Sequence, residues 1–275
     1  MLLVIPILTK TAATITQLGQ SLDNIDKFKS DEELKPLVNA LLQQKKKQKM
    51  LDKQKKQFTA NVSHELKTPL TSIAGYAELI EAGMAKPEDI KPFAGVIRKQ
   101  ALRLVNLSED IIQLSQLEES DDEDMSFESV NLYEIAQRCV EALNINAINK
   151  GVTLNLTGEE CYIRGKAQLV EELVYNLCDN AIRYNKENGN VTVTVTPLEK
   201  GASVSVKDTG IGIPKKYQER IFERFFRVDK SRSKATGGTG LGLAIVKHIT
   251  QLHDAKLEIS SEESKGTEII VTFKD

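Results

Sequence analysis

Apolar residues in the first half of the chain recur at spacings of three and four, which is the period of a helix with one buried side. The first series ends before a turn at 83–87, and its members are Val62, Leu66, Leu70, Ile73, Ala77, Ile80 and Met84. A second series follows the turn and consists of Phe93, Ile97, Leu104, Leu107, Ile111 and Leu114. The pattern predicts a helical hairpin, and two such hairpins would pair into a four-helix bundle in a homodimer.

A third series precedes the hairpin and has the spacing of a coiled-coil seam. Six of its nine positions are apolar, and the nine are Leu34, Leu37, Leu41, Gln44, Gln48, Leu51, Lys55, Phe58 and Val62. The lysine-rich faces around this seam have little to pack against except a second copy, so we interpret the segment as a parallel coiled-coil homodimer. The alternative is a single amphipathic helix on a globular core.

The second half of the chain, from about Met125, alternates between the periods of helices and strands. Helices are predicted at 132–150, 168–185 and 241–252, and strands at 152–156, 191–196, 202–208, 257–260 and 268–273. This order predicts a mixed sheet with helices on one face. The expected fold class is therefore multidomain α plus α/β: a coiled coil and helical hairpin, followed by an α/β sandwich with a mixed sheet.

Composition narrows the function classes. The 275 residues allow two or three domains, and 40% hydrophobic with 28% charged residues is typical of a globular protein. A net charge of −2 argues against bulk affinity for nucleic acid. Seven lysines and one acid lie in 45–56, whereas 118–124 holds six acids and no base, which we interpret as a solvated linker. Three cysteines without metal spacing favour reduced thiols in a cytosolic compartment.

The apolar run at 2–8 is far shorter than the roughly 20 residues that a membrane-spanning helix needs. It also lacks the basic start of a signal peptide. We interpret it either as the remnant of a membrane helix or as a core segment.

His64 is the first candidate for chemistry. It lies two residues beyond Val62, a rotation of roughly 200° on a helix, so its imidazole should face away from the apolar stripe and share a face with Thr68. A neutral imidazole is a nucleophile near neutral pH, and the neighbouring Glu65 could hold the correct tautomer or accept the proton. The alternative is an ordinary solvated histidine. Pro69 should bend the helix just after this turn, because the apolar stripe continues beyond it, although a helix end at 67–68 is the competing prediction.

Two further motifs are suited to a nucleotide. Glu172, Asn176 and Asn180 share one helix face at successive spacings of four, and amide oxygens are suitable Mg²⁺ ligands. Asp208 directly follows a predicted strand, where its carboxylate could accept from an exocyclic amine while the next two glycines admit a ring close to the backbone. A polar helix face and a tight turn are the ordinary interpretations of these two motifs.

A glycine-rich segment at 237–243 opens the last predicted helix. Backbone N–H groups and the helix dipole at such a start attract anionic phosphates. The spacing is not that of the dinucleotide fingerprint, and the chain has no GxxxxGK[ST] motif.

These motifs together closely resemble the sensor histidine kinases of bacterial two-component systems. Residues 58–70 resemble the phosphoacceptor box of that family. The asparagine helix, the turn after Asp208, the segment 220–227 and the glycine-rich helix start follow in the order of its catalytic ATP-binding domain. The resemblance covers about 58–273 and implies ATP-dependent phosphorylation of His64, transfer to an aspartate of a separate response-regulator receiver domain, and a phosphatase activity that uses Thr68.

The resemblance also implies binding roles. Asp208, with Gly210 and Gly212, would bind adenine, while Asn176 and Asn180 would hold Mg²⁺ and phosphate. Residues 214–236 would form a mobile lid. Arginine at 183 replaces the lysine that the family often has, which changes the donor geometry. The remaining contacts to ATP are expected from Arg183, Tyr184, Arg227, Gly238, Thr239, Gly240, Leu241 and Gly242.

Three domains are expected. Residues 1–45 resemble a HAMP signal-relay segment leading into the coiled coil, although Pro36 departs from that pattern. Residues 46–120 would form the dimerisation and phosphotransfer hairpin, and 125–275 the catalytic ATP-binding domain. The resemblance implies the cytoplasmic portion of a membrane sensor, attached through segments absent from this chain.

Two other function classes share some of these features. An ATP-driven conformational clamp of the gyrase and Hsp90 type has the same nucleotide fold, and the box around His64 argues against it. A catalytically inactive dimeric scaffold would not need the asparagine and glycine motifs.

Overall fold

The computed structural model describes residues 35–119, 126–229 and 238–274. The chain divides into two units, of which one ends at Glu65 and the other begins at Leu66. Residues 1–34, which make up most of the predicted HAMP-like segment 1–45, lie outside the described residues, as does most of the acidic linker. Among the described residues, none of the helices has the length and hydropathy that a membrane span needs.

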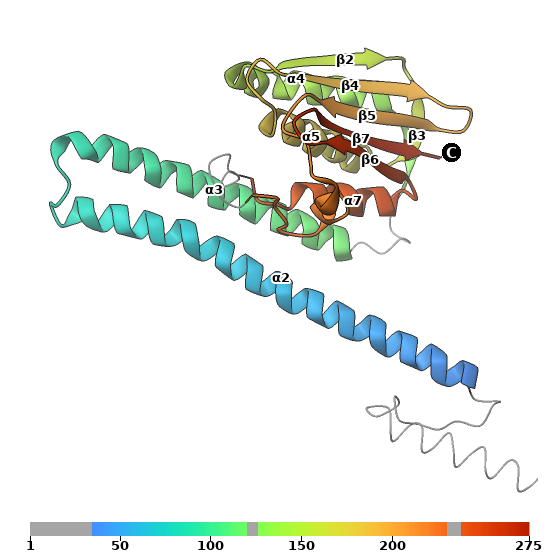
Figure 1. Cartoon of the computed structure of the whole chain (residues 1–275), viewed down its shortest axis with the longest axis horizontal. Coiled ribbons are helices and arrows are strands. Elements are labelled where there is room, and N and C mark those ends of the chain that lie inside the picture. The colour runs from blue at the N-terminus through green and yellow to red at the C-terminus, as the bar shows by residue number, and fades with distance from the viewer. Residues whose placement is uncertain (1–34, 120–125, 230–237, 275) are drawn as a thin grey trace, which may run out of the picture. The chain divides into compact units, whose positions relative to one another are not determined.

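The first described element is one long helix, α2 (Lys35–Glu81), which carries the predicted coiled-coil seam and the His64 box (Figure 1). It continues through Pro69, so the competing prediction of a helix end at 67–68 is wrong. Pro36 lies in the first turn, where proline is tolerated because its missing N–H would have no helical partner. Near this end, Val38 is buried and Leu41 and Leu42 pack against it.

The return helix α3 (Pro87–Glu119) confirms the predicted hairpin partner. A turn with Gly83 at φ +69° separates the two helices, and this left-handed conformation favours glycine. Across the hairpin, the ring of Tyr76 on α2 lies 4.9 Å from the ring of Phe93 on α3. Leu70 and Met84 of the predicted stripe are exposed in the single chain, and they are positions that the predicted dimer would cover.

Five strands form the mixed sheet that the sequence predicts. The strands are β2 (Thr153–Gly158), β4 (Asn190–Pro197), β5 (Ala202–Asp208), β6 (Lys256–Glu262) and β7 (Gly266–Phe273). Their spatial order is β2-β4-β5-β7-β6, with β2 and β4 parallel and the other neighbours antiparallel. Burial alternates along β4 and β5, so one face of the sheet is covered and the other is partly open to solvent.

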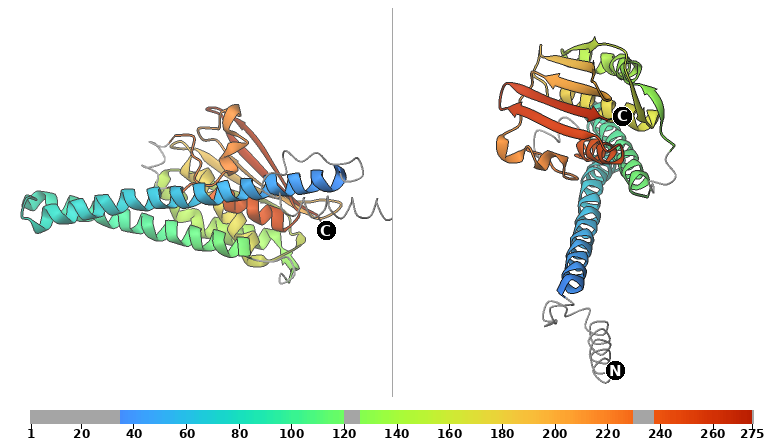
Figure 2. Two further views of the ribbon diagram at one scale, coloured as in Figure 1. Left: turned by 90° about the horizontal axis from the view of Figure 1, so that it is seen from below. Right: turned by 90° about the vertical axis from the view of Figure 1, so that its right-hand side faces the viewer.

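Three helices cover that face: α4 (Leu132–Lys150), α5 (Ala167–Arg183) and α7 (Gly242–Leu252) (Figures 1 and 2). Asn131 caps the start of α4, where its Oδ1 accepts from the N–H groups of Tyr133 and Glu134. The helix ends at Gly151 in a left-handed conformation. Ile135 and Leu143 of α4, Leu173 of α5 and Ile245 of α7 are almost completely buried between the two layers.

A small second sheet was not predicted from the sequence. It pairs β1 (Glu128–Asn131) with β3 (Tyr162–Gly165) in antiparallel register. Each strand has four residues, and Val130 and Ile163 supply most of its apolar burial. Such short segments have too few alternations for a period to be recognised.

His253, just after α7, is buried between Phe127, which stacks on it, and Phe273. Its Nδ1 lies 2.8 Å from the carbonyl oxygen of Ile249. Its Nε2 accepts at 3.2 Å from the backbone N–H of Lys166, which is the residue before α5. The ring is therefore held as the neutral tautomer protonated on Nδ1. Burial lowers the pKa of His253 from its ordinary value near 6.5.

The stability of the protein should therefore depend on pH through His253. Because its folded-state pKa is depressed, the unfolded chain binds the extra proton first as the pH falls below about 6.5. This contribution to stability is complete at neutral pH and is lost as the pH drops toward the folded-state value. Thermal unfolding of His253→Gln from pH 7.5 to 5 should show a shallower loss of midpoint than the wild type. His64→Gln, which removes an exposed imidazole, should keep the wild-type slope, and equal slopes for all three proteins would contradict the assignment.

Candidate functional site

His64 lies on α2 with 75% of its side chain exposed, as the sequence predicts. The carboxylate of Glu65 is much less exposed, and its Oε1 lies 3.9 Å from the Nδ1 of His64. This distance places an acceptor beside the ring but beyond hydrogen-bond length. Thr68, one helical turn later, is also exposed. The arrangement offers an accessible imidazole with a carboxylate and a hydroxyl nearby.

The other predicted site residues gather around a cavity of about 790 Å³ in the α/β layers. The cavity lies between α5, the turn after β5, the glycine-rich segment before α7 and the start of the predicted lid. Its lining includes Asn176, Asn180, Arg183, Tyr184, Asp208, Gly210, Gly212, Arg227, Gly238, Thr239, Gly240 and Gly242. The side chain of Leu241 is completely buried in the core and is absent from this lining, so its predicted contact with ATP would have to come from its backbone.

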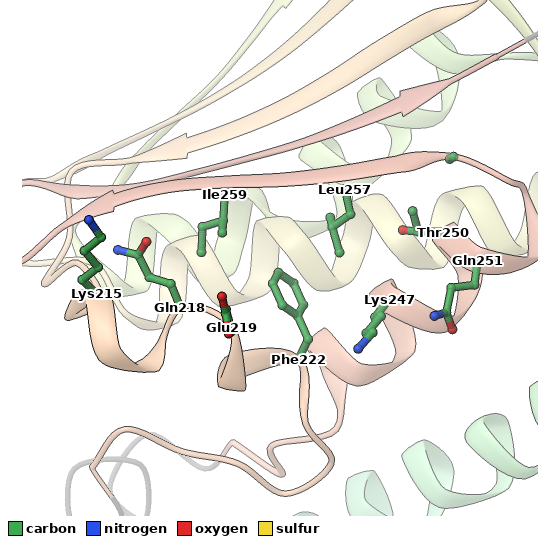
Figure 3. A pocket seen from close by; sticks show the side chains of 10 residues that line it. Lys215, Gln218, Glu219, Phe222, Lys247, Thr250, Gln251, Leu257 and Ile259 are labelled. Atoms are coloured by element: carbon green, nitrogen blue, oxygen red, sulfur yellow. The ribbon is translucent and has the colours of Figure 1, made fainter. Parts of the chain in front are cut away.

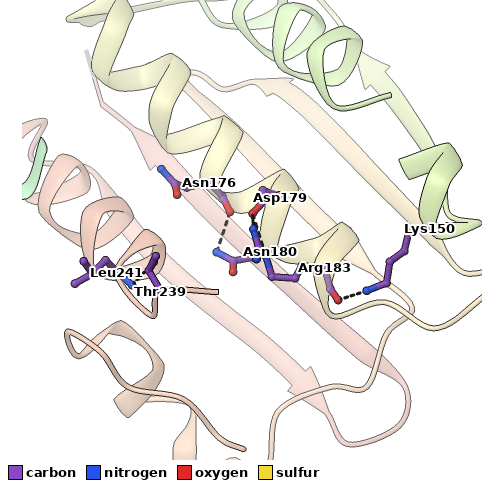
Figure 4. A network of polar contacts seen from close by, with 7 residues as sticks. All are labelled: Lys150, Asn176, Asp179, Asn180, Arg183, Thr239 and Leu241. Carbon is purple, nitrogen blue, oxygen red and sulfur yellow. Dashed lines mark hydrogen bonds and ion pairs between the residues drawn. The ribbon is translucent and has the colours of Figure 1, made fainter. Parts of the chain in front are cut away.

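The two asparagines of α5 are oriented by the helix itself (Figure 4). Asn176 donates from Nδ2 to the carbonyl oxygen of Glu172 at 3.0 Å, and Asn180 donates to the carbonyl oxygen of Asn176 at 2.9 Å. With both amide nitrogens held by the backbone, the amide oxygens are left for other partners. Asn176 Oδ1 lies against Gly242, where a Cβ atom would approach it to 2.6 Å.

This donor set fits Mg²⁺. The ion takes oxygen ligands and usually keeps several waters while it bridges phosphates, so two amide oxygens can suffice as its protein contacts. The described residues contain no cluster of three histidine, cysteine or acidic side chains that would form a complete protein cage. Nearby, burial raises the pKa of Glu172 to about 7, and its Oε1 is buried without a hydrogen-bond partner.

Asp208 ends β5 and is held by two backbone donors. The N–H of Gly210 donates to its Oδ1 at 2.7 Å, and the N–H of Thr267 on β7 donates to the same oxygen at 3.2 Å. Burial raises the pKa of Asp208, and these two hydrogen bonds oppose the shift. With Oδ1 engaged, Oδ2 is the oxygen that can accept from a ligand in the cavity.

Glycine is required in the turn after Asp208. A Cβ at Gly210 would lie 2.4 Å from the carbonyl oxygen of Tyr184, and one at Gly212, which has φ +65°, would lie 2.0 Å from that of Glu262. Ile211, Ile213 and other apolar side chains complete this wall of the cavity. A carboxylate acceptor beside an apolar slot is suited to a flat heterocycle with an exocyclic amine.

Cationic groups lie at the C-terminal end of α5. The guanidinium of Arg183 pairs with Asp179, with its terminal nitrogen 2.7 Å and its Nε 3.2 Å from Oδ2 (Figure 4). Lys150, at the end of α4, donates to the carbonyl oxygen of Arg183 at 2.6 Å, and burial lowers its pKa. Arg183 therefore faces the cavity with part of its charge already balanced.

The glycine-rich segment closes the same end. The Thr239 hydroxyl accepts from the N–H of Leu241 at 3.2 Å, just before α7 begins. Gly240 has φ +78°, and its carbonyl oxygen accepts from the N–H of Phe225 at 2.8 Å. A Cβ at Gly238 would lie 3.2 Å from the Tyr184 hydroxyl. The segment thus brings backbone close to α5 at the start of a helix, where anions are favoured.

The described part of the predicted lid contains two short turns, η4 (Lys215–Tyr217) and η5 (Arg220–Phe222). The side chain of Gln218 connects this part of the lid to β6 by donating to the carbonyl oxygens of Ile213 and Ser261. Residues 230–236, the rest of this prediction, lie outside the described residues.

A second hollow of about 500 Å³ lies between these turns, α7 and β6 (Figure 3). Lys215, Phe222, Lys247 and Leu257 are among its lining residues, and none of the predicted site residues lines it. The sequence motifs therefore assign the nucleotide to the larger cavity.

Comparison with known families matches both halves of this arrangement. Residues 54–120 match the His Kinase A (phospho-acceptor) domain, and residues 165–275 match the histidine kinase-, DNA gyrase B- and HSP90-like ATPase. The chain belongs to the sensor histidine kinases.

Relatives of this histidine kinase include two sensor kinases called WalK. The chain is 36% identical over 230 residues to sensor histidine kinase WalK of Bacillus subtilis, covering 82% of this chain and 38% of that protein. It is 33% identical over 237 residues to sensor protein kinase WalK of Staphylococcus aureus, covering 85% and 57%. The chain thus spans about two fifths to three fifths of the length of these relatives.

Two solved structures share the fold of this histidine kinase chain. Histidine kinase ThkA in complex with response regulator protein TrrA matches with a TM-score of 0.64 at 23% identity, covering 79% of this chain and 61% of that one. Histidine kinase AdeS of Acinetobacter baumannii matches with a TM-score of 0.62 at 22% identity, covering 77% and 97%.

The cavity residues of this histidine kinase that sequence reasoning missed include Asp110 and Lys150. Asp110 lies on α3, and burial raises the pKa of its carboxyl group. Neither residue belongs to a local motif, because each reaches the cavity from a helix distant in the sequence. The only signal for Lys150 was its place at the end of a predicted helix.

Gly242→Ala should weaken binding of Mg²⁺ and ATP by roughly tenfold or more, because the new Cβ would push Asn176 Oδ1 out of place, and such overpacking typically costs about 1–3 kcal/mol. Titration calorimetry of the full chain would measure this. Gly75→Ala is the matched control, since its Cβ would meet nothing within 4 Å. An unchanged affinity in Gly242→Ala would show that the position of Asn176 is not needed for binding.

Proposed function

We propose that the protein is the cytoplasmic kinase portion of a two-component sensor, which phosphorylates itself on His64 with ATP. The observation that carries the proposal is the exposed imidazole of His64 on α2, within the residues that match the phospho-acceptor domain. The cavity on α5, within the residues that match the ATPase family, supplies the nucleotide site in the same chain.

In this proposal the adenine amino group donates to Asp208 Oδ2, and the ring lies against the apolar wall beside Ile211 and Ile213. The amide oxygens of Asn176 and Asn180 hold Mg²⁺, which when bound offsets the charge of the phosphates. The glycine-rich segment 238–242 contributes backbone N–H groups to the phosphates. The cationic side chains that line the cavity include Arg183, Lys150 and Arg227.

The reaction is in-line displacement at the γ-phosphorus. A lone pair on one ring nitrogen of neutral His64 forms the N–P bond while the bond to the β,γ-bridging oxygen breaks, and ADP leaves with that electron pair. The proton on the other ring nitrogen passes to a base, for which Glu65 is the nearest candidate. The 3.9 Å separation in the resting chain would shorten to a hydrogen bond in the reacting complex.

The phosphoryl group would next pass to an aspartate of a response-regulator receiver domain. Histidine kinase ThkA forms a complex with response regulator protein TrrA, and this supports the same class of partner here. The exposed apolar positions of α2 and α3, including Leu70 and Ile112, support the homodimer. The expected HAMP-like role of 1–45 and attachment to a membrane through segments absent from this chain complete the proposal.

The two rival functions fit these observations less well. An ATP-driven clamp of the gyrase and Hsp90 type gives no role to the exposed His64 within a phospho-acceptor match. An inactive scaffold gives no role to the backbone-held amides of Asn176 and Asn180.

Incubation with Mg²⁺ and γ-labelled ATP should label the wild-type chain with a phosphate that is lost in acid and kept in alkali. His64→Gln should lose this label, because it removes the accepting nitrogen, while His248→Gln should retain it. Label that persists in His64→Gln would refute the acceptor assignment. Bound ATP without any label in the wild type would favour a clamp or a scaffold.

A phosphatase activity toward the regulator is favoured by the place of Thr68, exposed one turn after His64. Its hydroxyl could orient a water for attack on the phosphoaspartate. Thr68→Ala should slow dephosphorylation of the phosphorylated receiver domain by roughly a hundredfold, the lower end of the scale for one positioned catalytic group, and should leave autophosphorylation intact.

The receiver domain for this assay would be chosen from a set of candidate receiver domains. The choice is the one that accepts the labelled phosphoryl group fastest from the phosphorylated kinase. Thr71→Ala is the matched control, because the Thr71 hydroxyl donates to the carbonyl oxygen of Lys67 within the helix. Equal dephosphorylation by the wild type and Thr68→Ala would refute this role.

A further inference from the structure

The C-terminal half of α3 packs against the nucleotide-binding layers within the unit that begins at Leu66. Leu114 and Leu117 of α3 are almost completely buried, and α3 contacts α7. The carbonyl oxygen of Leu117 lies 2.9 Å from His248 Nε2, and Glu118 forms an ion pair with Arg224 of the predicted lid. Apolar burial, a hydrogen bond and an ion pair therefore hold this part of α3 in place.

Asp110 lies one helical turn before Leu114, on the same face of α3, and lines the nucleotide cavity. The hydroxyl of Thr239 donates to its carboxylate, and the positive charge of Arg183 lies near enough to stabilise its ionised form. Thr239 belongs to the glycine-rich segment, and Arg183 ends the asparagine helix (Figure 4). The carboxylate thus meets a hydroxyl donor and a cation at the end of the cavity that is proposed for the phosphates.

We infer that Asp110 is a nucleotide-selecting residue that takes the place of a terminal phosphate when α3 is docked. A carboxylate and a phosphate oxygen are both anionic acceptors, so they compete for the same Thr239 hydroxyl and the same Arg183 charge. The docked protein then accepts adenosine and tolerates ADP but disfavours ATP. Binding of ATP requires Asp110 to leave, which couples the nucleotide to the release of α3.

This inference rests on the proposed nucleotide site and adds a residue to it that lies outside the motifs of the ATP-binding half. The local charges support exclusion of a further anion. Asp179 already neutralises much of Arg183, and Asp110 adds a second carboxylate beside it. A γ-phosphate that entered the cavity here would lie near the carboxylates of Asp110 and Asp179, and the charge of Arg183 is already shared between those two groups.

The test is calorimetric titration of the full chain with adenosine, ADP and ATP in the presence of Mg²⁺. Asp110→Asn keeps the size of the side chain and removes its charge. It should bind ATP roughly tenfold more tightly, the scale expected when one like charge is removed beside a phosphate at a partly buried site, and it should bind adenosine with wild-type affinity. Glu109→Gln, an identical charge change on the adjacent exposed residue, should alter ATP affinity less than about twofold because solvent and salt screen that site.

A second variant leaves Asp110 intact. Glu118→Gln removes the ion pair with Arg224 and should loosen the docked helix, so ATP affinity should rise by a smaller factor of about three. Amide hydrogen exchange of the wild type should show faster exchange at 110–117 with ATP than with adenosine. These readouts carry the test if Asp110→Asn does not fold.

An unchanged ATP affinity in Asp110→Asn, or an equal gain in Glu109→Gln, would overturn the inference. Weaker ATP binding in Asp110→Asn would also overturn it, because the carboxylate would then be holding Mg²⁺ rather than excluding phosphate. Failure of the wild type to bind adenosine, ADP or ATP is a separate result, which would refute the nucleotide site itself.

Discussion

Helix α5 has to bury one face in the core and present the other to the nucleotide cavity, and the site depends on both faces. Val170, Leu173, Val174 and Leu177 are almost completely buried, and they fix the rotation of the helix against the sheet. That rotation sends Asn176 and Asn180 toward the cavity. Their amide nitrogens bond to the helix backbone, so the orientation of the amide oxygens follows from helix geometry. The packing of α5 in the core therefore also determines where its two amide oxygens point in the cavity.

The adenine end of the site depends in a similar way on sheet register. Asp208 ends β5, and the N–H groups that hold its Oδ1 come from the following turn and from Thr267 on β7. The pairing of Lys207 with Glu268 places Thr267 beside Asp208. A Cβ at Gly266 would lie 2.0 Å from the carbonyl oxygen of Asp208, so close approach of the two strands requires glycine there. A shift of one residue in this register would remove one of the two donors.

Sequence periodicity predicted the long elements well because each has many turns or alternations over which the pattern repeats. The helix at 132–150 and the strand at 202–208 agree with α4 and β5 at both ends. The pair β1 and β3 is too short to show a period. Motif reasoning selected residues that line one cavity, because each motif is local in sequence, whereas Leu241 has its side chain in the core and offers the cavity only its backbone. Asp110 reaches the site through tertiary packing of α3, which no local pattern encodes.

Several polar and charged groups at the phosphate end already have partners within the described protein before any nucleotide is considered. Arg183 is paired with Asp179, Lys150 is bonded to a backbone carbonyl, and Thr239 donates to Asp110. Binding a triphosphate there is therefore an exchange of partners and not simple addition to a vacant positive site. Exchange lowers the net affinity, because existing hydrogen bonds and ion pairs must be given up. It also gives the nucleotide a means to act on α3, since the group it displaces belongs to that helix. A site whose cations were unpaired would bind ATP more tightly. Binding there would displace no group of α3, so it could not change the position of the helical hairpin.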